Sequence, residues 1–249
     1  MLRDCPTGGY RYLPGIPAFS SGVVALPGHE IVHATLGAPV PWREGFTRVI
    51  DGHLRAAGRP RAALCGVALR SPAPFSFDGF AAFNEGYRAL LEDWKLLIGD
   101  DNPLPRTNVA PVAAAPREPA LYAFAYTVPG ETPVPTFVVA GAGELRDRAH
   151  GAQGIVRHGE TTPDAMRDKA RFVLNVMQQR MQALGAAWSG VTTIDVYCAH
   201  PIHDLAVEEI LPRAGAAAVH GVRWFPSRPP IQGLEFEVDL RGVRREVVV

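Results

Sequence analysis

Two groups of histidines have residue types and spacing that could bind a metal ion. The HEIVH run at 29–33 matches H-E-x-x-H, in which two histidines one helical turn apart hold zinc and the glutamate activates water. That geometry needs a helix, but Pro27-Gly28 lies just before the run and Gly37 just after it, which leaves too few residues for a stable helix. On a strand, His29 and His33 stand about 13 Å apart at roughly 3.3 Å per residue, too far to share one metal. We therefore predict a strand here, in a hairpin around Pro27-Gly28, with a zinc hydrolase as the minor alternative.

The second group is His200 and His203, which follow a predicted strand that ends at Cys198. Pro201 separates the two histidines, and no third and fourth ligand is evident near them. A polar surface loop is the favoured interpretation, because connections between elements are usually exposed. We predict no metal site here and no cofactor for the chain.

A more informative group contains an arginine that could bind a carboxylate. Arg106 stands where the proline turn Pro103-Leu104-Pro105 enters a predicted strand, and Asn84 lies upstream on a predicted helix. The proline turn would hold the arginine in place, and its forked guanidinium suits a carboxylate through two hydrogen bonds. From the pattern alone, an ordinary surface arginine is an equally good interpretation.

The elements that must position these residues occur twice along the chain. Residues 42–57 carry apolar residues at helical spacing, end at Gly58 and lead into the short apolar run LCGVAL. Residues 164–184 repeat this pattern, with Gly185 and then VTTIDVYC, at an offset of 127 residues between the two glycines. Each half ends with a strand that alternates residue by residue after a proline-bearing turn.

The two halves also differ. The first has a second helix whose apolar stripe extends from Phe80 to Ile98 and which Gly99 should end, whereas the second half has only HDLAVEEILPRAG in that place. The loop at 143–163 is correspondingly longer and polar. We predict an α+β fold in two halves, with domains at 1–130 and 131–249.

Composition excludes several classes of partner. The 249 residues include 25 Lys+Arg and 25 Asp+Glu, and this zero net charge argues against a surface for nucleic acid or anionic lipid. No stretch approaches the roughly 20 apolar residues of a membrane span, and no secretory signal is visible. The three cysteines form no CxxC pair. We expect a cytoplasmic protein with a small-molecule partner and neither nucleic acid nor membrane.

The motifs of both halves together resemble the RidA/YjgF superfamily. In the first half the resemblance rests on FAAFNEGYRALL, PLPRTNV and APREPALYAFAYTV, in that order. In the second half it rests on FVVAGAGEL, on the helix–glycine–strand unit that ends in TTIDVY, and on GLEFEVDL. The two copies cover nearly the whole chain. The resemblance implies two tandem units of the chorismate-mutase-like class, each a β-sheet backed by two helices.

The resemblance also implies an activity and site residues. Family members usually form trimers with small-molecule sites in clefts between units, and many hydrolyse enamines or imines with release of ammonia. The family arginine that holds the substrate carboxylate maps onto Arg106, and the helix asparagine onto Asn84. The family's acidic strand residue maps onto Tyr122 in the first half, which is a departure. In the second half it maps onto Glu235, with Glu237 two residues on along the same face, and the counterpart of Arg106 falls near His220.

The two copies thus look specialised, and a composite site is the resulting hypothesis. Arg106 would bind a carboxylate, while Glu235 or Glu237, from the other half or a neighbouring chain, would position a water or move a proton during C=N hydrolysis. Such a glutamate needs partial desolvation so that its pKa suits proton transfer near neutrality. Two alternatives remain: a chorismatase-like enzyme, suggested by F-N-x-G at 83–86 and by Pro135-Thr136-Phe137, and a non-catalytic ligand-binding or regulatory protein.

Overall fold

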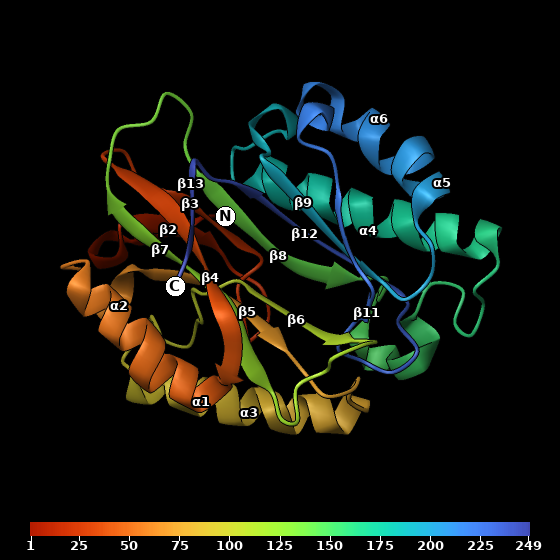
Figure 1. Cartoon of the computed structure of the whole chain (residues 1–249), viewed down its shortest axis with the longest axis horizontal. Helices are drawn as coiled ribbons and strands as arrows, with labels where there is room; N and C mark the ends of the chain where they lie inside the picture. Colours follow the sequence, from red (N-terminus) through yellow and green to blue (C-terminus); the bar gives the residue numbers. More distant parts are fainter.

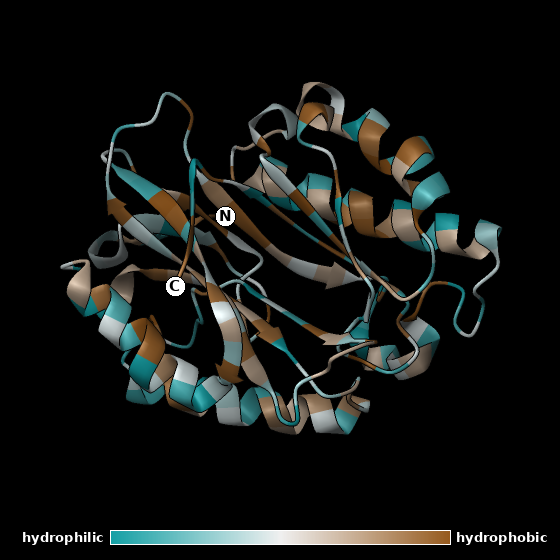
Figure 2. Ribbon diagram, viewed as in Figure 1, coloured by the Kyte–Doolittle hydropathy of each residue, from teal (hydrophilic) through white to brown (hydrophobic).

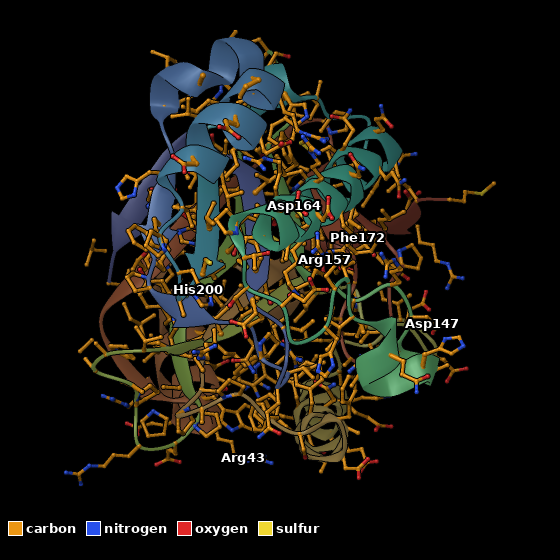
Figure 3. The ribbon with its side chains drawn as sticks, turned by 90° about the vertical axis from the view of Figure 1, so that its right-hand side faces the viewer. Arg43, Asp147, Arg157, Asp164, Phe172 and His200 are labelled. Atoms are coloured by element: carbon orange, nitrogen blue, oxygen red, sulfur yellow. The ribbon has the colours of Figure 1, made fainter.

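Two β-sheets lie face to face between two layers of helices (Figure 1). This arrangement is seen in a computed structural model that describes all residues, 1–249. In the turned view of Figure 3, the helices of the two halves lie at opposite ends of the molecule with the sheets between them.

The six-stranded sheet comes mainly from the first half of the chain. Its strands, in spatial order, are β11 (Ser227–Arg228), β6 (Arg106–Pro111), β5 (Leu64–Arg70), β7 (Ala120–Pro129), β4 (His29–Pro41) and β13 (Arg245–Val248). Its outer face packs against α3 (Phe77–Asp93) and against a helix that runs from α1 (Trp42–Glu44) through a π-helical turn to α2 (Asp51–Ala56).

The seven-stranded sheet comes mainly from the second half. Its strands, in spatial order, are β1 (Arg3–Cys5), β2 (Tyr10–Leu13), β3 (Gly22–Ala25), β8 (Phe137–Gly143), β12 (Phe236–Gly242), β9 (Thr193–Cys198) and β10 (Arg223–Phe225). Its outer face packs against α4 (Pro163–Ala183) and against a helical stretch from α5 (His203–Leu205) to α6 (Leu211–Ala214).

Local sequence signals explain where the long helices begin. The Ser76 hydroxyl accepts a hydrogen bond from the Gly79 N–H at the start of α3, and Thr162 caps α4 in the same way just before Pro163. The apolar stripe of α4 is buried against the sheet. Gly58 and Gly185, the predicted helix ends, have φ of 63° and 74°, the left-handed conformation that glycine adopts at no steric cost.

The two halves repeat one topology. The strand order β6-β5-β7-β4 in the first half corresponds to β10-β9-β12-β8 in the second. In each set the first pair is parallel and the other two pairs are antiparallel. The prediction of an α+β fold with two tandem sheet-plus-helix units is therefore confirmed.

The halves also exchange strands at their ends. β3, from the first half, pairs with β8 in the seven-stranded sheet, and β13, from the end of the chain, pairs in parallel with β4 in the six-stranded sheet. The HEIVH run is a strand, as predicted, but the predicted hairpin around Pro27-Gly28 is wrong. The reason is that these residues carry the chain from one sheet to the other, so β3 and β4 have different partners.

A second correction concerns the end of α3. The predicted helix reached Gly99, but α3 ends at Asp93, and Lys95 adopts a φ of 58°. The Lys95 and Leu96 N–H groups bond back to the last turn of the helix, which lets the chain reverse. Trp94 and Leu96 are then buried in the core, whereas Ile98, assigned to the apolar stripe, is 38% exposed.

Three hydrophobic clusters hold these layers together. One lies between each sheet and its helices, and the third fills the space between the two sheets around Tyr10, Tyr12, Ile31 and Cys65. Figure 2 shows β8 as a largely hydrophobic strand near the centre of the molecule. No helix in the protein combines the length and apolar composition that crossing a membrane requires.

Candidate active site

Arg106 is the first residue of β6 and lies inside the protein rather than on its surface. Its side chain is 3% exposed, and Nη2 donates a hydrogen bond of 2.6 Å to Oδ1 of Asn84 on α3. Nη1 is buried and has no hydrogen-bond partner. Four aromatic rings surround the guanidinium, with centroids 4.6 to 5.6 Å from its carbon, and they belong to Phe19, Phe80, Phe83 and Tyr87.

The Arg106 side chain borders a cavity of about 240 Å³ that both halves of the chain enclose. The first half supplies Arg106 and Asn108 from β6, with aromatic walls. The second half supplies Gly141 from β8, Arg180 from α4 and Glu237 from β12. Arg148, in the segment between β8 and α4, also lines it.

Glu237 is the acidic group of this cavity. Alternation along β12 explains its position, because Phe236, Val238 and Leu240 pack against the helices while Glu237 faces the other way. Its side chain is 3% exposed and forms no hydrogen bond or ion pair. Burial raises the pKa of Glu237 well above its usual value, and the nearby Asp239 carboxyl adds to the increase.

The cavity also contains hydrogen-bond donors without a partner. Asn108 Oδ1 accepts a hydrogen bond of 2.9 Å from the Ser71 hydroxyl, but Asn108 Nδ2 is buried and unpaired, like Nη1 of Arg106. Arg180 donates 2.8 Å to the Ala140 carbonyl and forms no ion pair. Burial lowers the pKa of Arg106 and of Arg180 to about 10 each, which leaves both cationic at neutral pH. Buried cations of this kind favour an anionic ligand.

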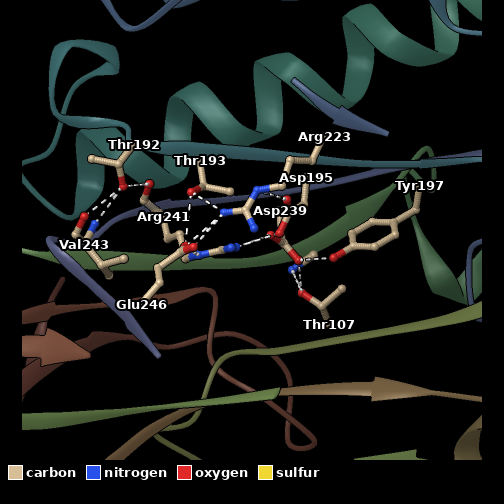
Figure 4. A network of polar contacts seen from close by, with 11 residues as sticks. Thr107, Thr192, Thr193, Asp195, Tyr197, Arg223, Asp239, Arg241, Val243 and Glu246 are labelled. Carbon is tan, nitrogen blue, oxygen red and sulfur yellow. Dashed lines mark hydrogen bonds and ion pairs between the residues drawn. The ribbon is translucent and has the colours of Figure 1, made fainter. Parts of the chain in front are cut away.

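A polar network next to Glu237 fixes the strands that present these groups (Figure 4). Asp239 accepts hydrogen bonds of 2.7 Å from the Thr107 hydroxyl of the other sheet and 3.0 Å from the Tyr197 hydroxyl. Arg241 bonds to Asp195 at 2.6 Å and to Glu246 of β13 at 2.7 Å. Because Thr107 and Asp239 are close neighbours of Arg106 and Glu237, their bond sets the separation between the two halves of the cavity.

Glu235, the alternative acidic residue, does not line this cavity. Its carboxylate pairs with Arg228 at 2.8 Å and with His200 at 3.1 Å, and it precedes the first residue of β12. Of the two glutamates predicted as alternatives, Glu237 is the one that lines the cavity with Arg106. The expectation that both lie on the same strand face is wrong, because Glu235 precedes the strand and turns toward the His200 loop. His203 begins α5 and lies on the surface.

Two further predicted site residues also lie elsewhere. Tyr122 stacks on Arg70, with 3.9 Å between the guanidinium carbon and the ring centroid, and lines a second, narrower cavity of about 40 Å³ between the sheets. His220 is exposed at the end of a 3-10 helix. The second-half strand that corresponds to β6 is β10, which begins at Arg223. The counterpart of Arg106, predicted near His220, therefore lies at Arg223.

Sequence reasoning missed three residues of the cavity. Asn108 could have been found, because it lies two residues after Arg106 on a strand and therefore shares its face. Arg180 lies on α4 outside the apolar stripe, and the stripe was the only feature of that helix that the sequence pattern revealed. Arg148 belongs to the long polar loop, which has no periodic signal that would show where its side chains point.

Solved structures similar to this chain include a chorismatase and single-unit proteins. The chorismatase is 13% identical, with a TM-score of 0.47, and the match covers 90% of this chain and 77% of that one. The YjgF gene product from E. coli is 17% identical, with a TM-score of 0.28, and the match covers 44% of this chain and 81% of that one.

The sequence comparisons are more specific. A family model described as 2-aminomuconate deaminase CnbZ matches residues 2–247. A protein of Comamonas testosteroni named 2-amino-5-chloromuconate deaminase is 40% identical over 245 residues, which is 97% of this chain and 96% of that protein. The chain belongs to the 2-aminomuconate deaminase CnbZ family.

Proposed function

We propose that this enzyme hydrolyses 2-aminomuconate, or a closely related conjugated 2-amino dicarboxylic acid, and releases ammonia from the carbon that carries the nitrogen. The observation that carries the proposal is the arrangement of one cavity. Glu237 lines it, and two further lining residues, Arg106 and Asn108, carry buried donors that have no partner within the protein. The substrate named for the family and that named for the relative are both amino derivatives of muconic acid, which fit such a set of groups.

Arg106 and Asn108 bind the carboxylate next to the amino-bearing carbon. Nη1 of Arg106 and Nδ2 of Asn108 have no partner within the protein, and a carboxylate supplies acceptors for both. The Asn84 side chain accepts a hydrogen bond from Nη2 of Arg106 and so fixes the orientation of the guanidinium. The surrounding aromatic rings exclude water, which strengthens the charge-assisted hydrogen bonds.

Glu237 acts first as an acid and then as a base. Because burial raises its pKa, it enters the reaction protonated and donates its proton to a carbon of the conjugated enamine. The carbon–carbon double bond is consumed as the imine forms. The carboxylate then takes a proton from the water whose oxygen bonds to the imine carbon. The carboxyl group returns that proton to the nitrogen, the carbon–nitrogen bond breaks, and ammonia leaves. The remaining hydroxyl proton passes to Glu237 as the carbon–oxygen double bond of the 2-oxo acid forms, which restores the protonated carboxyl group.

The decisive experiment measures ammonia released from freshly generated 2-aminomuconate by the wild type and three variants. Glu237→Gln should lower kcat by about 10²- to 10⁴-fold, because it removes the acid–base group. Arg106→Gln should lower kcat/KM by about ten- to a hundredfold through a higher KM, because it removes a charge-assisted carboxylate contact.

Glu235→Gln is the matched control, since it alters a neighbouring acid that lies outside the cavity, and it should keep wild-type turnover. Loss of activity in Glu235→Gln together with full activity in Glu237→Gln would overturn the assignment. Pyruvate release from chorismate by the wild type would favour the chorismatase-like alternative instead.

A further inference from the structure

The segment between β8 and α4 has no counterpart in the other half. In the first half, β4 ends at Pro41 and α1 begins at the next residue, Trp42. In the second half, β8 ends at Gly143 and α4 begins only at Pro163. Residues 144–162, here called the insertion, are therefore an addition to one copy of a duplicated unit.

The insertion is folded against the cavity rather than loose on the surface. Leu145 and Ile155 form a β-bridge, and the Arg146 N–H donates to the Gly154 carbonyl at 2.8 Å, which closes the loop on itself. Ile155 is buried in a small cluster with Phe80, Ile231 and Leu234. All three of these partners line the cavity. The insertion thus completes one wall.

Ion pairs hold both ends of the insertion in place. Glu144 and Lys169 form a fully buried pair at 3.2 Å, and Lys169 Nζ donates to the Val156 carbonyl at 2.7 Å. At the other end, Arg157 pairs with Asp164 at 2.5 Å at the start of α4. Figure 3 labels both residues. A segment anchored in this way presents its side chains in defined positions.

Arg148 is the arginine of the insertion that has no ion pair and faces the cavity. Arg157 is paired with three carboxylates, and Arg146 lies 6.0 Å from the Phe172 ring. The Arg148 guanidinium lies 5.0 Å from the Phe80 ring centroid and forms no hydrogen bond or ion pair. It lies close enough to Arg106 for the two charges to repel, and burial lowers the pKa of Arg148.

We propose that Arg148 binds the second carboxylate of the substrate and makes the enzyme selective for dicarboxylic acids. This inference rests on the proposed function of the same cavity. Three cations without an ion pair line the cavity, and Arg180 already donates to the Ala140 and Gly141 carbonyls. Arg106 and Arg148, from opposite halves of the chain, suit a ligand with a negative charge at each end. A rigid conjugated chain keeps its two carboxylates apart, so one arginine cannot serve both. The insertion is the part of the protein that adds this second contact.

The test compares two unreactive ligands that differ by one carboxylate. Trans,trans-muconate and sorbate share a six-carbon conjugated chain, and sorbate lacks the distal carboxylate. Titration calorimetry should show that wild type binds muconate more tightly than sorbate. Arg148→Gln should weaken muconate binding roughly tenfold, the value of one partly exposed charged contact, and leave sorbate binding unchanged. Arg146→Gln should bind both ligands like wild type, because it alters another exposed arginine of the same insertion, one that does not line the cavity.

Other outcomes separate this inference from the proposed function. Equal loss of muconate and sorbate binding in Arg148→Gln, or no loss of muconate binding, overturns the role of Arg148. Arg148→Lys should keep part of the preference for muconate that Arg148→Gln loses, because lysine carries the positive charge but lacks the guanidinium that forms two hydrogen bonds. If the wild type prefers muconate through Arg148 but releases no ammonia from 2-aminomuconate, the dicarboxylate site stands and the proposed reaction is wrong.

Discussion

Oε1 of Glu237 occupies the space that a side chain at position 141 would need, so Gly141 and Glu237 are sterically matched across the cavity wall. The two residues come from neighbouring strands of the seven-stranded sheet, β8 and β12. A Cβ at position 141 would also lie 3.1 Å from the Thr107 side chain, which belongs to the other sheet. The absence of a side chain at this position is therefore what allows a carboxyl group to sit between the halves.

Gly141→Ala should lower activity by displacing Glu237. The added methyl group overlaps Oε1 of Glu237, and overpacking of this kind costs about 1–3 kcal/mol in stability. We expect kcat for ammonia release to fall at least roughly tenfold, as for a misplaced acid–base group. Gly52→Ala, at a helical position with open space around it, is the control and should keep wild-type activity with no loss of stability, because alanine favours a helix more than glycine does. An active Gly141→Ala enzyme would show that Glu237 does not need its observed position.

Glu237→Gln should make the protein more stable at neutral pH although it lowers activity. The folded-state pKa of Glu237 lies above the usual value of 4.5, so the folded protein holds a proton that the unfolded chain releases. The free energy of unfolding of the wild type therefore falls as the pH rises above about 4.5, by about 1.4 kcal/mol per pH unit at most for one group.

Glutamine does not titrate, so the stability of the variant should exceed that of the wild type by an amount that grows with pH and is absent below about 4.5. Urea unfolding of both proteins between pH 4 and 8 measures this difference. If the free energies of unfolding of the two proteins differed by the same amount at every pH, the result would contradict a raised pKa at Glu237.

Glu246→Gln should have the opposite pH dependence. Burial alone would raise the pKa of Glu246, but its contacts with Arg241 and Arg223 lower it to about 2. A depressed pKa stabilises the folded state above the unfolded value of 4.5, and this contribution is lost as the pH falls toward 2. The variant should therefore be less stable than the wild type at neutral pH, with a gap that narrows in acid.

Thermal unfolding at pH 7 and at pH 3.5 tests this expectation. The effect should be modest, because the Glu246 side chain is 38% exposed and solvent screens the pair. Glu44→Gln, which removes an exposed ion pair on a helix, is the control and should change stability little at either pH. If the stability difference between the wild type and Glu246→Gln were larger at pH 3.5 than at pH 7, the pKa of Glu246 would not be lowered.

Much of the fold could be predicted because its signals are local. Helical spacing followed by a glycine marked the helix ends at Gly58 and Gly185, and the repetition of that unit revealed the duplication. The strand exchange could not be predicted in this way, because the pairing of β3 with β8 depends on residues more than a hundred positions apart. The end of α3 at Asp93 was missed for a related reason. The burial of Leu96 in the core, rather than the position of the next glycine, decides where that helix stops.

The site was predicted in part. The order of the motifs named Arg106 and Asn84 as site residues, and the structure places the two side chains in contact. The difference between the copies suggested a composite site, and both halves of the chain line the cavity beside Arg106. Local spacing could not choose between Glu235 and Glu237, because residues two apart on a strand share a face. The start of β12 at Phe236, which leaves Glu235 outside the strand, separates them, and the spacing does not reveal it. Arg148 depends on how a non-periodic insertion packs, which its composition does not encode.

The exchange of end strands has a consequence for how the protein is made. β13 lies at the edge of the six-stranded sheet, whose other main strands are translated much earlier. β1 to β3 can join the seven-stranded sheet only after β8 has been translated, because β3 pairs with β8. The first half therefore cannot reach its final form until the second half has been synthesised. A chain cut short within the second half lacks β13, so the edge of the six-stranded sheet beside β4 stays open.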